Sequence, residues 1–457
     1  MLTDIDDYRR WIEELTGMPV SAFERLSIGA SRGMYIVKRG QAEDLILRVD
    51  SGAGPFAGTE LTLAREAEVY RALSGQPVPI ARFEGATPDG SALLMGRVSG
   101  THDLATLAEA ERIAICDQFM DALAALHRID TEPLDLPSFH RPLDTRDHAI
   151  GELDLWERIF RQRVVRPAPL VHCAFAILRD LAPAYAGPTV LCHGDVGPRN
   201  FMFERGRITA LIDWEIAHLG DPMDDLAWWV FRGHEWLGAA GSLPDQLHRW
   251  SRASGIPLSA ARIAYYRAVL LLRWQVMILG ALDNGDASVD RFPYLSLVAV
   301  LDIKLSCALA DLARIDIGDF PDPLPAAASA DLDVIDILST DVRDHIIPAL
   351  AEPEALRRAA AVLSYAAHLA ARARFATGID AADLADLSQI LGRTPDEIDT
   401  GERQLTGTAR PADILRYAMR KGARHAELWP STRARALTPP WSIASLGLED
   451  IPAESAP

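Results

Sequence analysis

The sequence predicts an α+β protein with a small β-rich N-terminal lobe, a larger helical lobe and a small all-helical C-terminal domain. Short β-like runs are concentrated in the first 100 residues, and helical periodicity dominates after residue 104. A stretch rich in proline, alanine, glycine and serine at 318–330 is typical of a linker. We therefore expect an N-lobe over 1–100, a helical lobe over 101–317, a linker over 318–330, a helical domain over 331–435 and a tail over 436–457.

The N-lobe is predicted from short runs that are rich in β-branched and aromatic residues. We expect residues 1–25 to be helical. Residues 35–38 and 44–49 flank the turn RGQAE, and this arrangement is typical of a β-hairpin. A helix is expected near 58–74, and the segment 90–100 begins as a strand and ends at a glycine.

The helical lobe is predicted from apolar residues that recur at spacings of three and four. Over 104–130 they form one stripe: Ile113, Cys116, Phe119, Met120, Leu123 and Leu126. The segment 188–214 differs, because short apolar runs alternate there with polar loops and predict strands. The run AVLLLRWQVMILGAL, broken by Arg273, is expected to be a buried helix that is too short to span a bilayer.

Composition excludes several classes of protein. The 457 residues are 49% hydrophobic and 24% charged, a balance that argues against a disordered chain, a collagen or a disulfide scaffold. The formal charge of −18 repels phosphate backbones and anionic lipids, so we expect neither a nucleic-acid partner nor a membrane partner. The four cysteines form no CxxC pair, and the N-terminus is acidic, so we expect a cytoplasmic protein.

A cluster of polar residues between positions 193 and 213 carries the chemical signal. His193, Gly194 and Asp195 are followed by Asn200, and Asp213 comes directly after the apolar run ALI. Transfer of a γ-phosphoryl group needs positioning and charge neutralisation more than covalent catalysis. This set supplies a carboxylate that can take the proton of an acceptor hydroxyl, together with two oxygen donors suited to Mg²⁺.

Each residue of the cluster receives a predicted role. We place Asp195 and His193 in the catalytic loop, with Asp195 as the proton acceptor and His193 as a brace that acts through hydrogen bonds. Asn200 and Asp213 are the predicted metal ligands, and they contact the nucleotide through the metal.

The motifs resemble those of the aminoglycoside phosphotransferase family, relatives of choline kinase. The pattern HGDxxxxN, the segment IDWE and the downstream element GDxxxDLA all match, and the resemblance covers about residues 20–310. It implies a two-lobed protein-kinase-like fold, ATP or GTP as donor, Mg²⁺ and a small-molecule hydroxyl acceptor. Leu-Arg at 47–48 and Arg-Glu at 65–66 resemble the phosphotransferase module associated with some acyl-CoA dehydrogenases.

The resemblance also implies nucleotide-binding residues in the hairpins of the N-lobe. Ser31 and Gly33, in the small-residue segment LSIGASRGMYIV, are expected beside the phosphates. The family's phosphate-binding lysine is replaced by Arg48, which can bind phosphate through two N–H groups. Glu66 is the expected partner of this arginine, with Glu68 as the alternative.

Two other functions stay open beside the kinase interpretation. One is a pseudokinase-like module that binds a nucleotide or a partner without turnover, which the missing lysine favours. The other is a metal-dependent hydrolase that uses His193 and Asp195. The C-terminal helices resemble an uncharacterised module appended to some bacterial phosphotransferases, and their pattern is typical of packing onto the preceding lobe or into a homodimer. The acceptor is not specified by the sequence.

Overall fold

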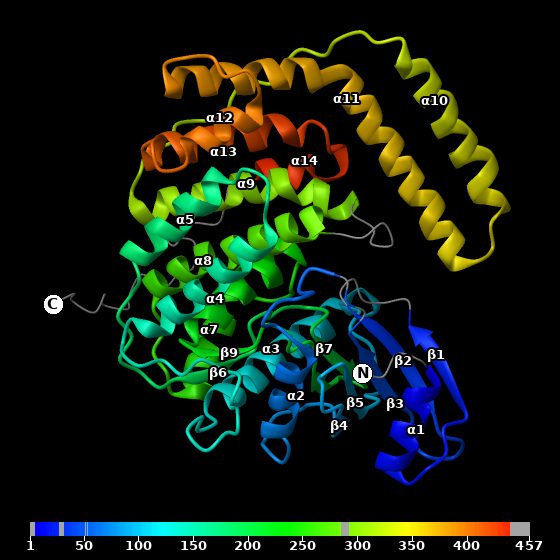
Figure 1. Ribbon diagram of the computed structural model, residues 1–457. Helices are drawn as coiled ribbons and strands as arrows, with labels where there is room; N and C mark the ends of the chain where they lie inside the picture. The colour runs from blue at the N-terminus through cyan, green and yellow to red at the C-terminus, as the bar shows by residue number, and fades with distance from the viewer. Residues whose placement is uncertain (1–4, 27–31, 51, 53, 285–291, 439–457) are drawn as a thin grey trace. The chain divides into compact units, whose positions relative to one another are not determined.

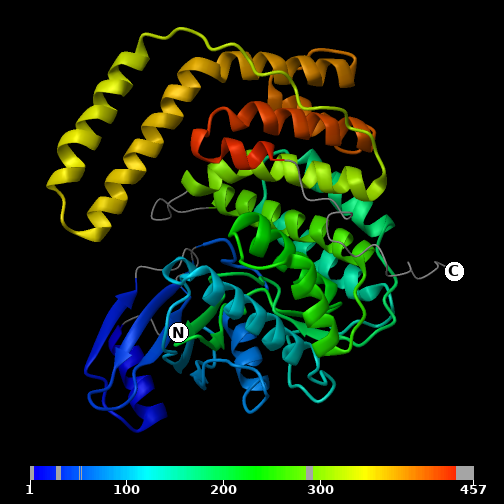
Figure 2. The same cartoon turned by 180° about the vertical axis from the view of Figure 1, so that it is seen from behind.

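The computed structural model describes residues 5–26, 32–50, 52, 54–284 and 292–438 (Figures 1 and 2). They form two compact units. The first comprises Met1–Gln162 and Ala182–Leu270, and the second comprises Arg163–Leu181 and Leu271–Pro440. Parts of the predicted helical lobe therefore fall in the second unit, and the lobe and linker boundaries predicted above stay predictions.

The first unit contains a five-stranded antiparallel sheet. Its strands are β1 (Ala22–Leu26), β2 (Gly33–Lys38), β3 (Leu45–Val49), β4 (Phe83–Ala86) and β5 (Ala92–Gly96), in the order β1-β2-β3-β5-β4. The pair β2–β3 is the predicted hairpin, and β5 is the predicted strand before Gly100. The α+β class and the β-rich N-terminal region are thus confirmed.

The prediction of a helix over 1–25 is wrong after Thr16. Helix α1 (Ile5–Thr16) ends because Gly17 adopts a φ of +66°, and its N–H donates to the Glu13 carbonyl at 2.9 Å. Pro19 follows, where a continuing helix would lose a hydrogen bond, and the chain enters β1 instead.

The two faces of the sheet have different tasks. On one face Tyr8 and Ile12 of α1 pack with Val37, Leu45 and Leu47 in a buried apolar cluster. Because side chains alternate along a strand, the residue after Leu47 points to the opposite face. On that face lies helix α2 (Leu63–Ala72), which begins where the Thr62 hydroxyl accepts from the Arg65 N–H at 3.3 Å.

The remainder of the first unit is mostly helical, with short strands around the predicted chemical site. The helices are α3 (Glu109–His127), α4 (Asp147–Arg163), α6 (Met223–Trp228), η2 (Trp229–Trp236), α7 (Leu243–Ser254), the start of α8 (Ala260–Asn284) and the short η1 (Leu104–Thr106). The strands are β6 (Val190–Cys192), paired with β9 (His218–Gly220), and β7 (Phe201–Glu204), paired with β8 (Arg207–Leu211). Strands in 188–214 are thus confirmed, whereas β9 was not predicted.

Helix α8 corrects the length that we expected for the apolar run around Arg273. It has 25 residues, and by length and composition it is long and apolar enough to cross a membrane. However, 89% of its most apolar window is buried inside the protein, and buried core helices pass the same test. The expectation of a buried helix is confirmed, and the length alone is weak evidence for a membrane span.

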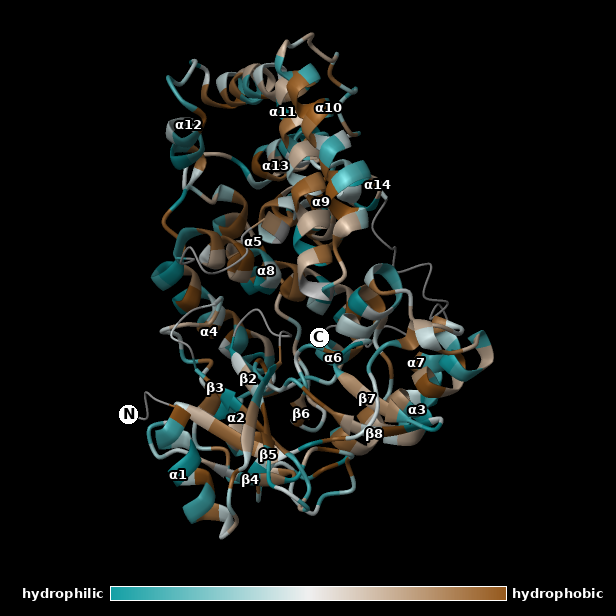
Figure 3. Ribbon diagram, turned by 90° about the vertical axis from the view of Figure 1, so that its right-hand side faces the viewer, coloured by the Kyte–Doolittle hydropathy of each residue, from teal (hydrophilic) through white to brown (hydrophobic). Residues whose placement is uncertain are grey.

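The second unit is helical throughout its regular structure. Its helices are α5 (Pro169–Asp180), the end of α8, α9 (Phe292–Ala313), α10 (Asp331–Asp341), η3 (Val342–Ile346), η4 (Ile347–Ala349), α11 (Pro353–Leu391), α12 (Ile398–Leu405), α13 (Pro411–Ala426) and α14 (Pro430–Leu437). Figure 3 shows hydrophobic residues along α9 and α13. Helices α9 and α13 pack closely against each other at Gly422. A Cβ atom at this position would lie only 2.9 Å from the Ala299 carbonyl oxygen. Residues 318–330 have no regular structure apart from a turn at the end.

Candidate active site

The loop after β6 is held in place by one buried carboxylate. Asp225, on α6, accepts from the N–H of His193 at 2.7 Å and from the N–H of Gly194 at 2.8 Å. Gly194 has a φ of +83°, and a Cβ there would lie 2.2 Å from the carbonyl oxygen of Ile216. Only glycine fits this approach, so the HGD turn has a steric reason for its middle residue.

His193 is fixed by hydrogen bonds to the main chain at both ring nitrogens. Its Nε2 donates to the Ile212 carbonyl at 2.9 Å, and its Nδ1 accepts from the Asp195 N–H at 3.3 Å. Burial lowers the pKa of His193, so the ring stays neutral. This geometry agrees with a bracing role, and it argues against a hydrolase that would use His193 as a metal ligand.

Asp195 lies between an amide and a guanidinium. The Asn200 Nδ2 donates to the Asp195 Oδ2 at 2.6 Å, and the Arg232 Nη1 lies 3.2 Å from Oδ1. Arg232 also donates from Nη1 to the Asp195 carbonyl at 2.9 Å and from Nη2 to the Asn200 Oδ1 at 3.3 Å. The three side chains therefore form one hydrogen-bonded group at the end of the loop.

The environment of Asp195 keeps its carboxyl group close to a protonation boundary. Burial raises its pKa to about 6, the charge of Arg232 opposes this rise, and the charge of Asp213 adds to it. At neutral pH the carboxylate form predominates. A carboxylate with a raised pKa is suited to accept a proton, since general bases act best when their pKa is close to the working pH.

Asp213 lies two residues after β8, as the apolar run before it predicted. It adopts a φ of +71°, which is uncommon for a residue with a side chain and recurs at active sites and in turns. Its side chain is 36% exposed, and its Oδ1 lies 3.5 Å from the Arg48 Nη2. The carboxylate is thus open to a ligand on one side and bound to a cation on the other.

Arg48 lies in the third strand, as predicted, and pairs with the predicted glutamate. Its Nη1 donates to the Glu66 Oε1 at 2.5 Å. Although burial opposes the charge on this guanidinium, Glu66 and Asp213 raise the pKa of Arg48. Glu68, the alternative partner, accepts instead from the backbone and hydroxyl of Ser138 at 3.0 Å and 2.6 Å.

Two charged residues complete this ion-pair group: Glu215, which received no role from the sequence, and Arg32, for which a phosphate contact and an ordinary hairpin position both stayed open. Glu215 has its Oε2 3.6 Å from Arg48, and Arg32 lies 3.7 Å from Glu215 and 3.6 Å from Glu66. Glu215 belongs to the segment IDWE, so the motif itself was the signal. Nothing in the sequence marks Arg232, which lies 32 residues after Asn200.

Only the end of the small-residue loop of the N-lobe falls within the described residues. Ser31 lies outside them. Gly33 opens β2 opposite Val49, and a Cβ at Gly33 would make ordinary contacts, the nearest with the Tyr35 ring at 3.5 Å. The predicted phosphate contacts of both residues stay predictions.

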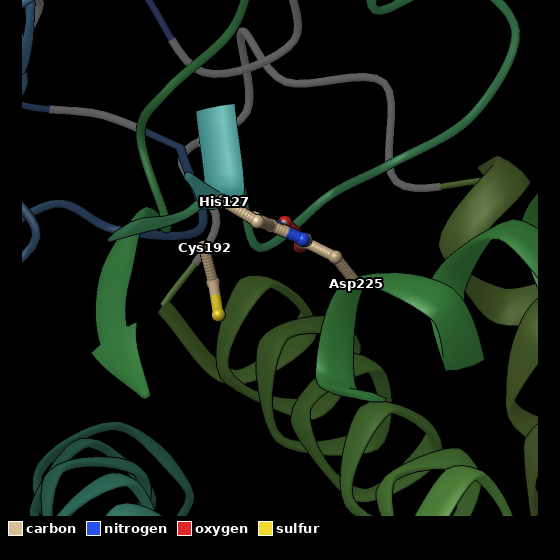
Figure 4. Close-up of side chains that lie close together, drawn as sticks. All are labelled: His127, Cys192 and Asp225. Atoms are coloured by element: carbon tan, nitrogen blue, oxygen red, sulfur yellow. Dashed lines mark hydrogen bonds and ion pairs between the residues drawn. The ribbon is translucent and has the colours of Figure 1, made fainter. Parts of the chain in front are cut away.

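A third group of side chains, His127, Cys192 and Asp225, has metal-ligand chemistry (Figure 4). The His127 ring meets the Asp225 carboxylate at 3.0 Å, and its other nitrogen accepts from Trp250 at 3.1 Å. Asp225 is already bound by two loop N–H groups. The Cys192 Sγ donates to the Asp221 carbonyl at 3.5 Å. Because hydrogen bonds already engage all three side chains, we interpret the cluster as the anchor of the HGD loop.

The residues predicted to hold a metal have suitable chemistry. Asn200 offers an amide oxygen and Asp213 a partly exposed carboxylate, and hard cations such as Mg²⁺ prefer oxygen ligands. Glu66 and Glu215 lie beside Arg32 and Arg48, and burial raises the pKa of Glu215 to about 8. Asp213 is thus the partly exposed carboxylate of this group that is open to a cation. This donor set therefore fits a divalent cation.

Part of the chain is similar in sequence to known proteins. The chain is 25% identical to mouse acyl-CoA dehydrogenase family member 10 over 211 residues, which cover 44% of the chain and 19% of that protein. It is 25% identical to the probable acyl-CoA dehydrogenase IBR3 of Arabidopsis thaliana over 333 residues, which cover 62% of the chain and 40% of that protein. The chain thus corresponds to less than half of the length of these relatives.

Solved structures match the same region. A putative aminoglycoside phosphotransferase from Ralstonia eutropha has 23% sequence identity and a TM-score of 0.49, covering 64% of this chain and 93% of its own. The model of the phosphotransferase enzyme family matches residues 22–269, more than half of the chain. That segment contains the antiparallel sheet, the HGD loop and Asp213, and the match confirms the predicted family resemblance. The chain belongs to the phosphotransferase enzyme family.

Proposed function

We propose that the chain transfers the γ-phosphoryl group of ATP or GTP to a hydroxyl group of a small molecule, with Mg²⁺. The observation that carries this proposal is the pair of neighbouring charged groups: the Asp195–Asn200–Arg232 group, and the Arg48–Glu66–Asp213 group that supplies the cation and the metal-ligand carboxylate. Phosphoryl transfer requires these components and little else from a protein.

Each side chain has a defined task in this proposal. Asp195 accepts the proton of the acceptor hydroxyl through the carboxylate that Arg232 and Asn200 hold in place. The guanidinium group of Arg48, which Glu66 holds in place, would bind the phosphates of the nucleotide. His193 keeps the loop in position through its two main-chain hydrogen bonds.

Asn200 and Asp213 would hold Mg²⁺, which neutralises the charge of the phosphates when it is bound. The relatives are named as acyl-CoA dehydrogenases, and the chain corresponds only to a part of them. Their names therefore do not specify the acceptor. Aminoglycosides, choline-like alcohols, sugars and hydroxyacyl compounds are all candidates.

A screen of these acceptors with Mg·ATP and Mg·GTP tests the proposal, with phosphorylated product detected by mass spectrometry. Asp195→Asn should lower turnover by about 10²–10⁴-fold, the usual contribution of a general base, and should leave nucleotide affinity nearly intact. Asp135→Asn, at an exposed loop position of the same unit, is the matched control and should retain activity. Equal turnover by wild type and Asp195→Asn would contradict the role of Asp195.

A second candidate function is a pseudokinase-like module that binds a nucleotide without turnover. It is favoured by the arginine at position 48, whose guanidinium is already engaged by Glu66, Asp213 and Glu215. Nucleotide binding by calorimetry together with no ATP hydrolysis and no product in the screen would support this alternative over phosphoryl transfer.

A further inference from the structure

A pocket of about 360 Å³ lies entirely within the second unit. Residues of α5, α8, α9, α12 and α13 line it, together with the segment before α5. None of the residues discussed for phosphoryl transfer contributes to it. The pocket therefore needs its own explanation.

Eight of the residues that line the pocket are apolar, and we call them the apolar wall: Pro167, Ala168, Pro169, Leu170, Val171, Leu279, Val298 and Ala418. The apolar wall favours the carbon atoms of an organic ligand. It does not favour a metal ion, because apolar side chains have no oxygen atoms to replace the water that the ion would lose.

The two cationic residues in the lining are already paired. The Arg166 Nη2 lies 2.6 Å from the Asp283 Oδ1, and the Lys421 Nζ lies 2.5 Å from the Glu402 Oε1. Glu402 also accepts from the Tyr417 hydroxyl at 2.8 Å. These pairs leave no free positive charge for an anionic ligand among the described lining residues.

Two buried acceptors in the pocket lack full partners. Asp302 is 9% exposed, and it accepts a hydrogen bond from the Gln275 Nε2 at Oδ1, at 2.8 Å. Gln275 is 2% exposed, and its Oε1 has no hydrogen-bond partner among the described residues. A buried acceptor without a donor is costly, so these two groups point to a ligand that donates hydrogen bonds.

The net negative charge of the lining residues also favours a ligand that donates hydrogen bonds. Asp302 and the exposed Asp399 remain after the two ion pairs are counted. Burial raises the pKa of Asp302 to about 6, with Lys421 opposing the rise, so this carboxyl is ionised at neutral pH. The lining thus combines negative charge and hydrogen-bond acceptors with apolar surface.

We propose that this pocket binds a small organic cation: a primary ammonium group on a short aliphatic body. The ammonium group would donate to the Asp302 carboxylate and the Gln275 Oε1, and the aliphatic body would lie along the apolar wall.

The test uses the full chain, with butylamine as the probe. Binding of butylamine is measured by ligand-observed NMR titration at neutral pH. Butanol and butyrate have similar carbon bodies and serve as neutral and anionic comparisons. Saturable binding of butylamine alone is the expected result. No saturable binding of butylamine, or equal binding of butanol or butyrate, would overturn the proposal.

Variants place the binding in the pocket. Asp302→Asn keeps an oxygen for Gln275 but removes the charge, and it should weaken butylamine binding by at least about tenfold, as expected for one charge-assisted hydrogen bond. Val298→Phe should abolish binding by filling the pocket. Asp380→Asn, at an exposed position of α11, should bind like wild type.

Circular dichroism checks that each variant is folded. If Asp302→Asn does not fold, Val298→Phe decides the outcome by itself. Undiminished butylamine binding by either folded variant would show that the ligand lies elsewhere and would refute the assignment.

Discussion

Asp195 shows how one carboxyl group depends on its immediate neighbours. Removal from water favours its neutral form, and the nearby carboxylate of Asp213 acts in the same direction. Arg232 opposes both effects at a distance of 3.2 Å and so helps to keep the group ionised at neutral pH. The protonation state that the proposed chemistry requires is therefore set by a residue that belongs to none of the sequence motifs.

The first prediction at this scale concerns pH. Since only ionised Asp195 can accept a proton, turnover should fall as the pH drops through about 6. Arg232→Gln removes the opposing charge, so the pKa of Asp195 should rise further and the acidic limb should move to higher pH, by about one unit. Turnover at several pH values measures this shift.

Arg232→Lys is the control for the pH prediction, because it keeps a positive charge and should keep the limb close to its original position. A uniform loss of turnover in Arg232→Gln, with no displacement of the limb, would mean that Arg232 only holds the loop in shape.

Asp213 allows a prediction about the metal. Asp213→Ala removes the partly exposed carboxylate that would hold Mg²⁺, so the variant should lose most of the Mg²⁺-dependent part of its nucleotide affinity. Calorimetric titration with nucleotide in the presence and absence of Mg²⁺ measures it. The same Mg·ATP affinity in variant and wild type would count against this role.

Among the elements of the first unit, the HGD loop is the most constrained. It enters from β6, turns at Gly194 and is anchored by Asp225 of α6, which His127 at the end of α3 also contacts. Asp225 is fully buried, and its hydrogen-bonded partners keep its pKa low despite burial. The end of α3, the loop after β6 and the start of α6 thus meet at the Asp225 carboxylate.

Gly194→Ala tests this constraint. The alanine would combine a left-handed backbone with a contact of 2.2 Å to a carbonyl oxygen. A strained backbone conformation alone costs about 1–3 kcal/mol. Because the contact adds to this strain, we expect the free energy of unfolding to fall by more than that amount. Denaturant titration measures it.

Gly206→Ala is the matched control, because Gly206 has a φ of +76° in the turn between β7 and β8 but nothing within 4 Å of the point that a Cβ would occupy. It should lose only about 1 kcal/mol. Similar losses at the two positions would show that the contact with Ile216 is easily relieved.

The helices of the second unit differ in how completely they are covered. Helix α10 has no buried residue within its bounds, and Val334 and Ile337 on it are 68% and 64% exposed. By contrast, α13 buries one face beside α9. The homodimer expected from the sequence stays a prediction, as do the absence of nucleic-acid and membrane partners and the cytoplasmic location.

For the whole molecule, the net charge of −18 is the main electrostatic feature. Mutual repulsion of this charge disfavours the compact state, and salt screens it. Raising the salt concentration from about 10 mM to about 150 mM shortens the screening length from about 30 Å to about 8 Å. The midpoint of thermal unfolding should rise by roughly 2–4 °C, the shift that about 1 kcal/mol produces in a unit of this size. A lower midpoint in salt would mean that exposed ion pairs outweigh the repulsion.

Much of the fold could be predicted from local sequence. The hairpin β2–β3, helix α2 and the strands β6 to β8 have clear apolar patterns or turn residues. The strands β1, β4 and β9 were missed because their local preference for a strand is weak, and pairing with β2, β5 and β6 compensates for it. The length of α8 was misjudged because its ends carry polar residues that tertiary packing accommodates.

The sequence by itself determined the family and the set of chemical groups. His193, Asp195, Asn200 and Asp213 lie close together in the chain, so their spacing alone indicates a loop that presents them jointly. The tertiary structure decided the charges around them. Arg48 meets Asp213 across 165 residues, and Arg232 approaches Asp195 across 37. Electrostatic interactions depend on distance in space and on burial, and a linear pattern contains neither.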